Sequence, residues 1–518
     1  MGGRWRLACL GLVASLAIAA CGGSGSGNQI QGPNPKGSSL IASAPGEPDS
    51  LDPMGGISGF AVTYLYQIYD TLIHLDPQTN QLKPELATSW EWATPDKLTL
   101  RLHLRQNVKF QDGTPVNADA VKVSIEHAKT FTRWPDLIPV KSVTVVNQNT
   151  ADVNLSQPYA QLPAILSWRG GMLISPTALQ KYGADFGRHP VGAGAFAFES
   201  WQPGAEIKLT KFKDYWDASH VKLAGVDFKI IANPTAQVTA LRAGQLDVGT
   251  LANLENLPSV QGASNLDVNT RNMTALSLIT TANKTPPFNN PQVRRAANMS
   301  IDRHAIAVTA NTKNLVDKGI GAPAWQYVLP SEWPYSSDLK NYPHDPAQAK
   351  KLLAQAGYPN GVTVQLCNIQ GNPDTIPQIE KQQMAQAGFN LVIQDEPVNS
   401  CLAKMQNGGV PMVQIGWAGL ADPYQTYATM FGPFSSQGPY PGVNEMLVKA
   451  ASSYTQGEQQ QIYRQLNKTL FDLSPSIPLY YNVNVGITNK RVQGVEFTKV
   501  QFVTFFKHAS LRTGTSGT

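Results

Sequence analysis

The sequence predicts a mixed α/β fold with at least one partly parallel sheet. Hydrophobic residues make up 42% of the 518-residue chain and charged residues 15%, so the chain can bury substantial cores. Apolar runs with a period of two, typical of strands, alternate along the chain with runs whose apolar residues fall three or four apart, typical of helices. These observations favour layered strands and helices over an all-helical or all-strand protein.

The N-terminus has the pattern of an export signal. Two arginines precede an unbroken apolar or small stretch over residues 7–20, as a charged region precedes a hydrophobic region in such signals. Two alanines then stand directly before Cys21 and resemble a lipobox, in which the cysteine sulfur is acylated and the chain is cut just before it. An ordinary signal peptide with an incidental cysteine is the alternative. We therefore expect a lipoprotein signal peptide over residues 1–20 and a flexible Gly/Ser/Pro linker over 21–38.

The first half of the body shows clear strand and helix signals. Four leucines alternate with polar residues over 98–105, which puts the leucines on a core face and His103 on the solvent face. Asn117 is expected to cap a helix over 118–129. The other elements expected here are a strand over 39–44, a helix over 62–74, and a hairpin of 143–146 with 152–155.

Helix boundaries are marked most clearly in the second half. Asn290 and Asp345 each stand directly before a proline, a pairing typical of the first residues of a helix. The second of these helices is expected to end at Gly357, and an earlier helix over 237–243 at Gly244.

Two cysteines, Cys367 and Cys401, remain in the folded body. Residues 362–366 are predicted to form a strand, 376–387 a helix and 390–393 the next strand, and such a unit is normally parallel and right-handed. Both cysteines then lie beyond the carboxyl ends of the two strands, at the same edge of the sheet. We expect a disulfide between them, because thiols outside the cytosol can pair.

The size and charge of the mature chain limit its partners. Cleavage before Cys21 leaves 498 residues, which predicts two or three lobes. Loss of the two signal arginines lowers the formal net charge from +5 to +3, too mild and scattered for a nucleic-acid-binding surface. No second apolar stretch approaches the roughly 20 residues of a membrane helix, so only the lipid anchor is expected to enter the membrane.

The segment LATSWEWATPDKLTLRLHLRQNVKFQDGTPVNADAV, residues 86–121, carries a family pattern. It resembles the signature of the extracytoplasmic solute-binding proteins of the peptide, nickel and opine group, family 5, which deliver ligands to ABC importers. Further blocks match in the expected order over about residues 41–500, nearly the whole mature chain. These blocks are 50–53, 69–72, 191–196, 214–216, 241–247, 287–288, 293–296, 345–353 and 477–480.

The resemblance implies a two-lobed fold like that of class II periplasmic binding proteins, with mixed sheets and an extra subdomain in the first lobe. It places the first lobe at 39–270 plus 484–518 and the second at 271–483, with two strand crossings as the hinge. It implies a monomer that captures a peptide-like or other small solute and delivers it to ABC permease and ATPase subunits. The expected location is the outer face of the cytoplasmic membrane, with no enzymatic activity, cofactor or metal.

The resemblance also points to ligand contacts after a Gly-Trp pair at residues 416–417. In peptide-binding members an aspartate in this stretch pairs with the α-amine of the ligand. In this chain Leu420 stands at the position where that aspartate is expected. Asp422 either takes that role in a shortened segment or forms a turn with the proline after it. Gln414 stands where some oligopeptide binders have an arginine that pairs with a carboxylate of the ligand. Glutamine can form hydrogen bonds there but carries no charge. The two missing charges favour an oligosaccharide, or a modified or longer peptide, over a zwitterionic peptide.

Aromatic side chains complete the candidate site. Trp417 is expected to contact the ligand, since an indole can stack on it and donate its N–H; packing in the lobe core is the alternative. Tyr424 is a further candidate in the same stretch. From the first lobe Ser58, Phe60 and Trp134 are candidates to face the cleft, with a structural role as the alternative. An aromatic loop contains Trp325, Tyr327, Trp333 and Tyr335. This loop either lines the cleft or covers the second lobe.

Two other classes of protein were weighed against a binding protein. A secreted, lipid-anchored hydrolase lacks support, because the folded body contains no Gly-x-Ser-x-Gly and no His-Glu-x-x-His motif. The eight histidines are dispersed singly, and the carboxylate pair at 395–396 lies at a predicted strand end, where solvation is expected. A sensor or adhesin that reuses the fold is the third possibility, since fold does not fix function.

Overall fold

The computed structural model describes residues 39–44, 46–56, 59–76, 79, 81–131, 137–251, 254–339, 341–369, 375–397, 400–401, 403–404, 407, 409–418, 422–432, 435, 438, 440–500 and 503–512. The predictions for Cys21, Ser58, Trp134 and Leu420, and for the signal peptide and linker, lie outside these residues. Within them, no helix is both long and apolar enough to cross a bilayer.

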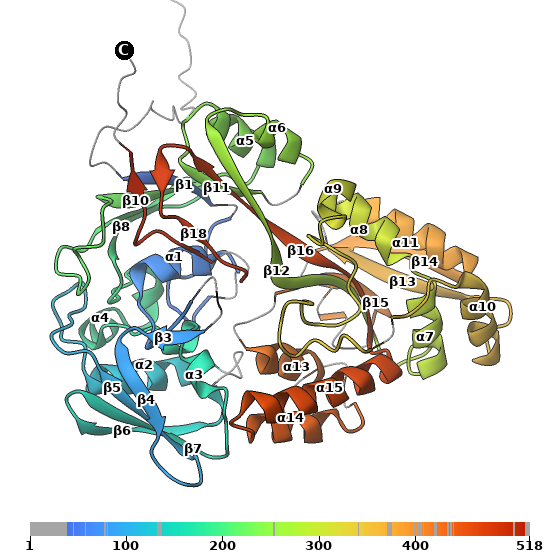
Figure 1. The fold of residues 1–518 in the computed structure, drawn as a ribbon, viewed down its shortest axis with the longest axis horizontal. Coiled ribbons are helices and arrows are strands. Elements are labelled where there is room, and N and C mark those ends of the chain that lie inside the picture. The colour runs from blue at the N-terminus through green and yellow to red at the C-terminus, as the bar shows by residue number, and fades with distance from the viewer. Residues whose placement is uncertain are drawn as a thin grey trace, which may run out of the picture.

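One ten-stranded mixed sheet runs through the whole molecule. Its strands in chain order are β1 (Leu40–Ala44), β8 (Phe196–Gln202), β9 (Glu206–Lys211), β10 (Gly225–Ile230), β11 (Val248–Leu251), β12 (Leu266–Thr281), β13 (Val362–Ile369), β14 (Phe389–Glu396), β15 (Met412–Ala418) and β16 (Ser476–Asn489). Across the sheet the order is β14-β13-β15-β12-β16-β11-β1-β10-β9-β8. Figure 1 shows a lobe at each end of this sheet, joined by β12 and β16, which confirms the predicted two-lobed mixed α/β fold.

The long strands β12 and β16 pair antiparallel from one lobe into the other. On the first-lobe side β16 also pairs with β11, and on the second-lobe side β12 also pairs with β15. Between the two, the register shifts between Asn272 and Leu276. The lobe boundaries near residues 270 and 484 stay a prediction, and they fall beside this irregularity.

A separate four-stranded antiparallel sheet in the first lobe corresponds to the expected extra subdomain. Its order is β4-β5-β7-β6, with β4 (Ala87–Trp92), β5 (Thr99–Leu104), β6 (Val140–Asn147) and β7 (Thr150–Leu155), and α2 (Ala118–Lys129) packs against it. Burial alternates along β5 as its leucines predict. The side chain of Asn117 caps α2 by accepting the Ala120 N–H at 3.0 Å. His103 is partly exposed beside Glu91, with Nε2 and Oε1 3.5 Å apart.

The remaining elements of the first lobe are short. They are α1 (Ala61–Ile68), β2 (Ile73–Leu75), β3 (Leu82–Pro84), α3 (Leu162–Ile165), α4 (Pro176–Tyr182), α5 (Pro234–Arg242), α6 (Leu257–Gln261), β17 (Val492–Gln493), β18 (Glu496–Phe497), β19 (Thr504–Phe505) and β20 (Ser510–Leu511).

The helix predicted over 62–74 is wrong beyond Ile68. The backbone turns extended at Tyr69, with φ −118° and ψ 132°, and the chain continues as a hairpin of β2 with β3. The cause is tertiary: the carboxylate of Asp70 accepts hydrogen bonds from Tyr215 Oη at 2.9 Å and Trp216 Nε1 at 2.8 Å. These bonds to a distant segment hold Asp70 in the interior, which outweighs the local helical pattern.

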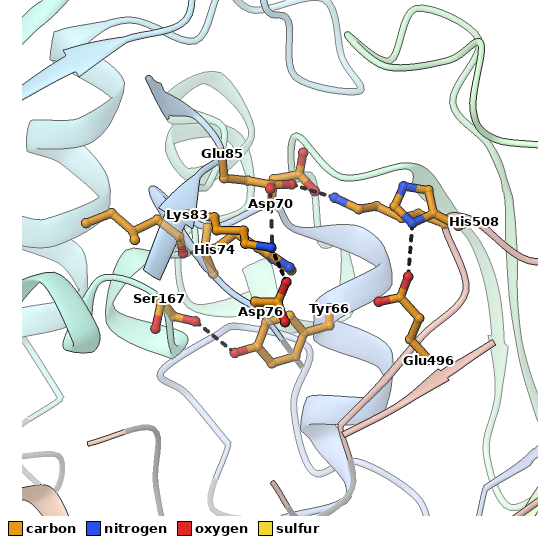
Figure 2. Close-up of polar contacts among 12 residues, drawn as sticks. Tyr66, Asp70, His74, Asp76, Lys83, Glu85, Ser167, Glu496 and His508 are labelled. Atoms are coloured by element: carbon orange, nitrogen blue, oxygen red, sulfur yellow. Dashed lines mark hydrogen bonds and ion pairs between the residues drawn. The ribbon is translucent and has the colours of Figure 1, made fainter. Parts of the chain in front are cut away.

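A buried charge cluster fastens the C-terminal segment to this hairpin. Lys507 Nζ lies 2.7 Å from Glu85 Oε1. Figure 2 shows Asp70, His74 and Glu85 gathered beside α1, with Glu496 and His508 reaching in from the C-terminal segment. Burial raises the pKa of Asp70, the charge of Glu85 adds to this rise, and Lys507 and the two hydrogen bonds oppose it. Since its charged groups have partners, this cluster has the character of a structural anchor.

Two layers of helices cover the two faces of the sheet in the second lobe. Its helices are α7 (Pro291–Met299), α8 (Arg303–Asn311), α9 (Lys313–Val316), α10 (Pro346–Gln355), α11 (Thr375–Gln386), α13 (Pro423–Phe431), α14 (Val443–Ala451) and α15 (Gln456–Leu473). One core contains residues of α7, α10 and α11, and a second contains residues of α13, α14 and α15. Figure 1 shows these groups on opposite sides of the strands. The predicted caps Asn290 and Asp345 accept backbone N–H groups of α7 and α10.

The predicted strand–helix–strand unit is present as β13, α11 and β14, and its two strands are parallel. A disulfide links Cys367 to Cys401, whose Cα atoms are 5.8 Å apart. Cys367 lies inside β13 and not beyond it, because the strand continues to Ile369. The disulfide is enclosed by Val410 and Val413 and ties the segment after β14 to the strand.

Candidate functional site

The carboxyl end of β15 lies at the junction of the two lobes. Ala418 pairs with Ala275 of β12, next to the irregular register, whereas Met412 pairs with Thr281 deeper in the second lobe. β13 pairs with β15 only as far as Gln414. In the part of the chain that the structure describes, the backbone beyond Gln414 therefore has a neighbouring strand on one side only. Such an open edge can bind an extended chain through backbone hydrogen bonds.

The two candidates on β15, Gln414 and Trp417, occupy opposite faces of the sheet, because successive strand residues alternate. Ile415 and Trp417 pack against the core of α13, α14 and α15. Gln414 shares its face with Met412, which belongs to the core of α7, α10 and α11. The structure therefore does not bring these two candidates into one pocket.

Both candidates have a buried polar atom without a hydrogen-bond partner among the described residues. These atoms are Nε1 of Trp417 and Oε1 of Gln414, and Gln414 as a whole is 7% exposed. Most buried polar atoms in proteins are hydrogen-bonded, and an unmet one costs about 1–3 kcal/mol. A solute with complementary groups would satisfy them.

Asp422 forms the turn that was one of its two alternatives. Its Oδ1 accepts the Tyr424 N–H at 2.7 Å and caps α13. Burial raises the pKa of Asp422 to about 7; the capping hydrogen bond opposes the rise and the charge of Glu332 adds to it. Capping occupies one carboxylate oxygen, and no cation of the described residues forms an ion pair with Asp422, so the second oxygen is available to a further donor.

Tyr424 contacts both lobes. It packs against the core of α13, α14 and α15 in the second lobe and against the core of the extra subdomain in the first. Its ring centroid lies 5.7 Å from that of Tyr159. Tyr424 therefore lies where the two lobes meet.

The first lobe also caps the end of α14, which lies beside it in Figure 1. The Ala160 N–H donates to the Ala451 carbonyl at 2.8 Å, and Gln161 Nε2 donates to the Ala450 carbonyl at 3.1 Å. The last carbonyls of a helix have no partner inside it. The Ser453 N–H of the second lobe also donates to the Ala450 carbonyl, at 3.3 Å, so the bonds from the first lobe add to the capping of this helix end.

Tyr454 adds another contact between the lobes. Its ring centroid lies 5.0 Å from that of Trp92 in β4, and its hydroxyl donates to the Lys97 carbonyl at 3.4 Å. Together with the capped end of α14, this contact holds the lobes together at a place separate from β12 and β16.

The other predicted aromatic contacts in the described residues have neighbours against which they pack. Phe60 precedes α1, and its ring lies so close to Gly46 that a Cβ there would clash with it. In the aromatic loop, Trp333 packs on Tyr463 and Tyr327 on Phe431, with ring centroids 5.4 and 4.6 Å apart. The aromatic loop therefore covers the second lobe, which was one of the two interpretations of its sequence.

One buried charge escaped the sequence analysis. Glu380 of α11 is 0% exposed, and neither carboxylate oxygen has a hydrogen-bond partner among the described residues. Its spacing was an available signal: Ile376 and Met384, four residues to either side, lie in the core of α7, α10 and α11. A charge on such a stripe is unusual in a helix that packs on a sheet.

Two lobes joined by two strands, with an open strand edge and unsatisfied polar groups at their junction, are typical of a solute-binding protein. Residues 81–438 match the family described as bacterial extracellular solute-binding proteins, family 5. The chain belongs to this family, as the sequence blocks predicted. It is therefore a binding protein that works outside the cytoplasm and not an enzyme, which removes the hydrolase alternative.

Known proteins resemble the chain over most of its length. The glutathione-binding protein GsiB of Shigella flexneri is 27% identical over 470 residues, which cover 86% of this chain and 89% of GsiB. A dipeptide-binding protein of Pseudoalteromonas sp. SM9913, solved in complex with Met-Leu, has a TM-score of 0.81 at 20% identity and covers 92% of this chain and 100% of its own. The periplasmic binding protein DppA of Helicobacter pylori, in complex with peptide STSA, has a TM-score of 0.78 at 24% identity. The match covers 92% of this chain and 98% of the DppA chain.

We predict that Gln161→Ala favours separation of the lobes. The variant removes the hydrogen bond from Gln161 to the Ala450 carbonyl, which exists only when the lobes are together, so the closed form should lose about 1 kcal/mol relative to the open form. Small-angle X-ray scattering should then give a larger radius of gyration. Gln459→Ala is the matched control, because Gln459 donates to the Ser453 carbonyl within the second lobe. Identical scattering of Gln161→Ala and wild type, with and without solute, would contradict the prediction.

Proposed function

We propose that the protein captures a peptide-like solute between its lobes and delivers it to the permease and ATPase subunits of an ABC importer. The observation that carries this proposal is the open edge of β15 at the lobe junction, where the described residues provide a strand neighbour on one side only. An extended peptide can add to such an edge by main-chain hydrogen bonds. The peptides named with two of the similar proteins support the same solute class.

In this proposal Asp422 and Trp417 make the decisive contacts. The second oxygen of Asp422 accepts the ammonium group of the solute, and the ion pair offsets the burial of the carboxylate. Trp417 donates its indole N–H to a solute carbonyl. Tyr424 closes the site against the first lobe, from which Ser58, Phe60 and Trp134 stay predicted contacts.

An oligosaccharide is the second candidate solute. Gln414 favours it, because its buried Oε1 carries no charge and has no partner among the residues that the structure describes, and a sugar hydroxyl can donate to it. The two candidate solutes differ in the ammonium group, which a peptide has and a neutral sugar lacks.

Closure is proposed to occur about β12 and β16, between a first lobe of 39–270 plus 484–518 and a second lobe of 271–483. The register shift between Asn272 and Leu276 interrupts the ladder of hydrogen bonds at this place, so bending there disturbs little pairing. The contacts of Gln161 and Tyr454 form when the lobes come together.

A solute screen tests the proposal directly. Purified residues 22–518 should gain thermal stability with peptides, because a solute that binds only the folded state stabilises it by mass action. Trp417→Ala should weaken binding of the best peptide about tenfold, and Trp417→Phe, which keeps a ring but has no N–H, should lie between the two. Stabilisation by oligosaccharides alone would favour the second candidate; release of a chemically altered solute would overturn both.

The charge of Asp422 predicts how affinity depends on pH. Its pKa in the folded protein is about 7, so the carboxylate that binds ammonium is present above pH 7 and is lost as the pH falls through 7. Calorimetry should therefore show affinity for a free-amine peptide falling between pH 8 and pH 5.5. Asp422→Asn, which still caps α13, should bind it about tenfold more weakly at pH 8 and without this pH dependence. N-acetylated peptide is the control, and equal pH profiles for the two peptides would contradict the assignment.

We further propose that Cys21 carries a lipid that anchors the protein at the outer face of the cytoplasmic membrane. Tethering raises the effective concentration of loaded protein at the importer. Cys21→Ser should move the protein from the membrane fraction to the soluble extracytoplasmic fraction, and mass spectrometry of the wild-type protein should find acyl chains on an N-terminal cysteine. An unmodified wild-type protein in the soluble fraction would refute the anchor.

A further inference from the structure

Glu380 is a fully buried carboxyl group whose oxygens have no partner in the described part of the chain. Burial raises its pKa well above the ordinary glutamate value. Proteins rarely keep such a group unless a cation or hydrogen-bond donor meets it. An apolar residue at this place would instead complete the core between Ile376 and Met384. The carboxyl group is thus a cost to stability that calls for a functional explanation.

A set of polar residues at the lobe junction borders the core in which Glu380 is buried. Tyr480 of β16 packs against the core of α7, α10 and α11, to which the residues of α11 on either side of Glu380 belong. A hydrogen bond joins Tyr480 to Ser277. Ser277 Oγ in turn donates to Asn482 Oδ1 at 2.9 Å, and Ser277 pairs across β12 with Gly416 of β15. We name Tyr480, Ser277 and Asn482 the polar ledge. Its residues are partly accessible and Gly416 is exposed, so the ledge faces open space beside the candidate strand edge.

Gln414 lies on the same face of β15 as Gly416, two residues before it, and its buried Oε1 also has no partner within the described ranges. Gly416 leaves the approach to the ledge clear: even a Cβ there would lie 3.7 Å from Asn482 Nδ2, its nearest neighbour. This side of the sheet therefore combines two buried groups without partners among the described residues, a carboxyl group and an amide oxygen, with accessible polar groups at its margin. A positively charged nitrogen with several N–H groups matches this combination, whereas an anionic or purely apolar group does not.

We propose that Glu380 is the counter-charge for a basic side chain of the solute, an ammonium or guanidinium group that enters past Gly416 over the polar ledge. This inference rests on the proposed function, since it requires a peptide along β15. The side chain of Glu380 turns toward the ledge to meet the basic group, and Gln414 Oε1 accepts a second N–H. Asp422 follows β15 in the chain and binds the α-amine separately, so Glu380 acts as a specificity residue for a second positive charge.

Matched peptides test this inference on purified residues 22–518. The set is tri-alanine with one alanine replaced, at each position in turn, by lysine or by norleucine, which has the same stem without the ammonium group. Calorimetry should show one position at which the wild type binds lysine at least tenfold more tightly than norleucine. Glu380→Gln should lose this preference and bind the norleucine peptide as wild type does. Glu445→Gln, which changes an exposed carboxylate of α14, should keep it.

Glu380→Met separates loss of specificity from loss of folding. Because it replaces an unpartnered buried carboxyl by an apolar side chain, its Tm without solute should equal or exceed that of wild type, while the lysine preference is lost. Peptides bound without a lysine preference, or a preference kept in both variants, would overturn the inference and leave the proposed function intact. Failure of the wild type to bind any peptide would overturn both.

Discussion

The pairing of β12 with β16 is the constraint on which the two-lobed structure depends. The two strands lie far apart in the chain, yet their hydrogen-bond ladder runs from the first lobe into the second and makes the sheet continuous. Because backbone pairs fix direction and spacing, every strand added on either side takes its place relative to this pair. The break in register at Asn272 is the place where the ladder is weakest, and the end of β15 is brought beside it.

The unmet polar groups follow from the same arrangement. Trp417, Gln414 and Glu380 each place a polar atom in the interior without a partner among the described residues, and two of them lie on β15. Leaving such atoms unpaired lowers stability, whereas pairing them with a solute raises affinity. The two atoms on β15 therefore lie where a solute can offset the stability that they cost, whereas Lys507 and Glu85 in the first lobe pair with each other.

Local signals in the sequence predicted much of the fold. Asn117 and Asp345 cap helices where expected, because a cap depends on a few adjacent residues. The helix over 62–74 failed at Asp70, whose partners Tyr215 and Trp216 are some 145 residues away in the chain. For the site, the sequence identified the β15 segment but grouped Gln414 with Trp417, which strand alternation places on opposite faces. It missed Glu380, although the spacing from Ile376 marked a buried position.

The sequence by itself determined the family, the mixed α/β class and the segment that carries the candidate contacts, because these depend on residue order and on short-range spacing. Only the tertiary structure decided which of these residues meet. The structure shows that the Tyr424 N–H takes one oxygen of Asp422 and leaves the other for the proposed solute contact, and that Glu380 is buried without a partner among the described residues. Pairing and burial are properties of segments brought together from distant parts of the chain, and no local pattern encodes them.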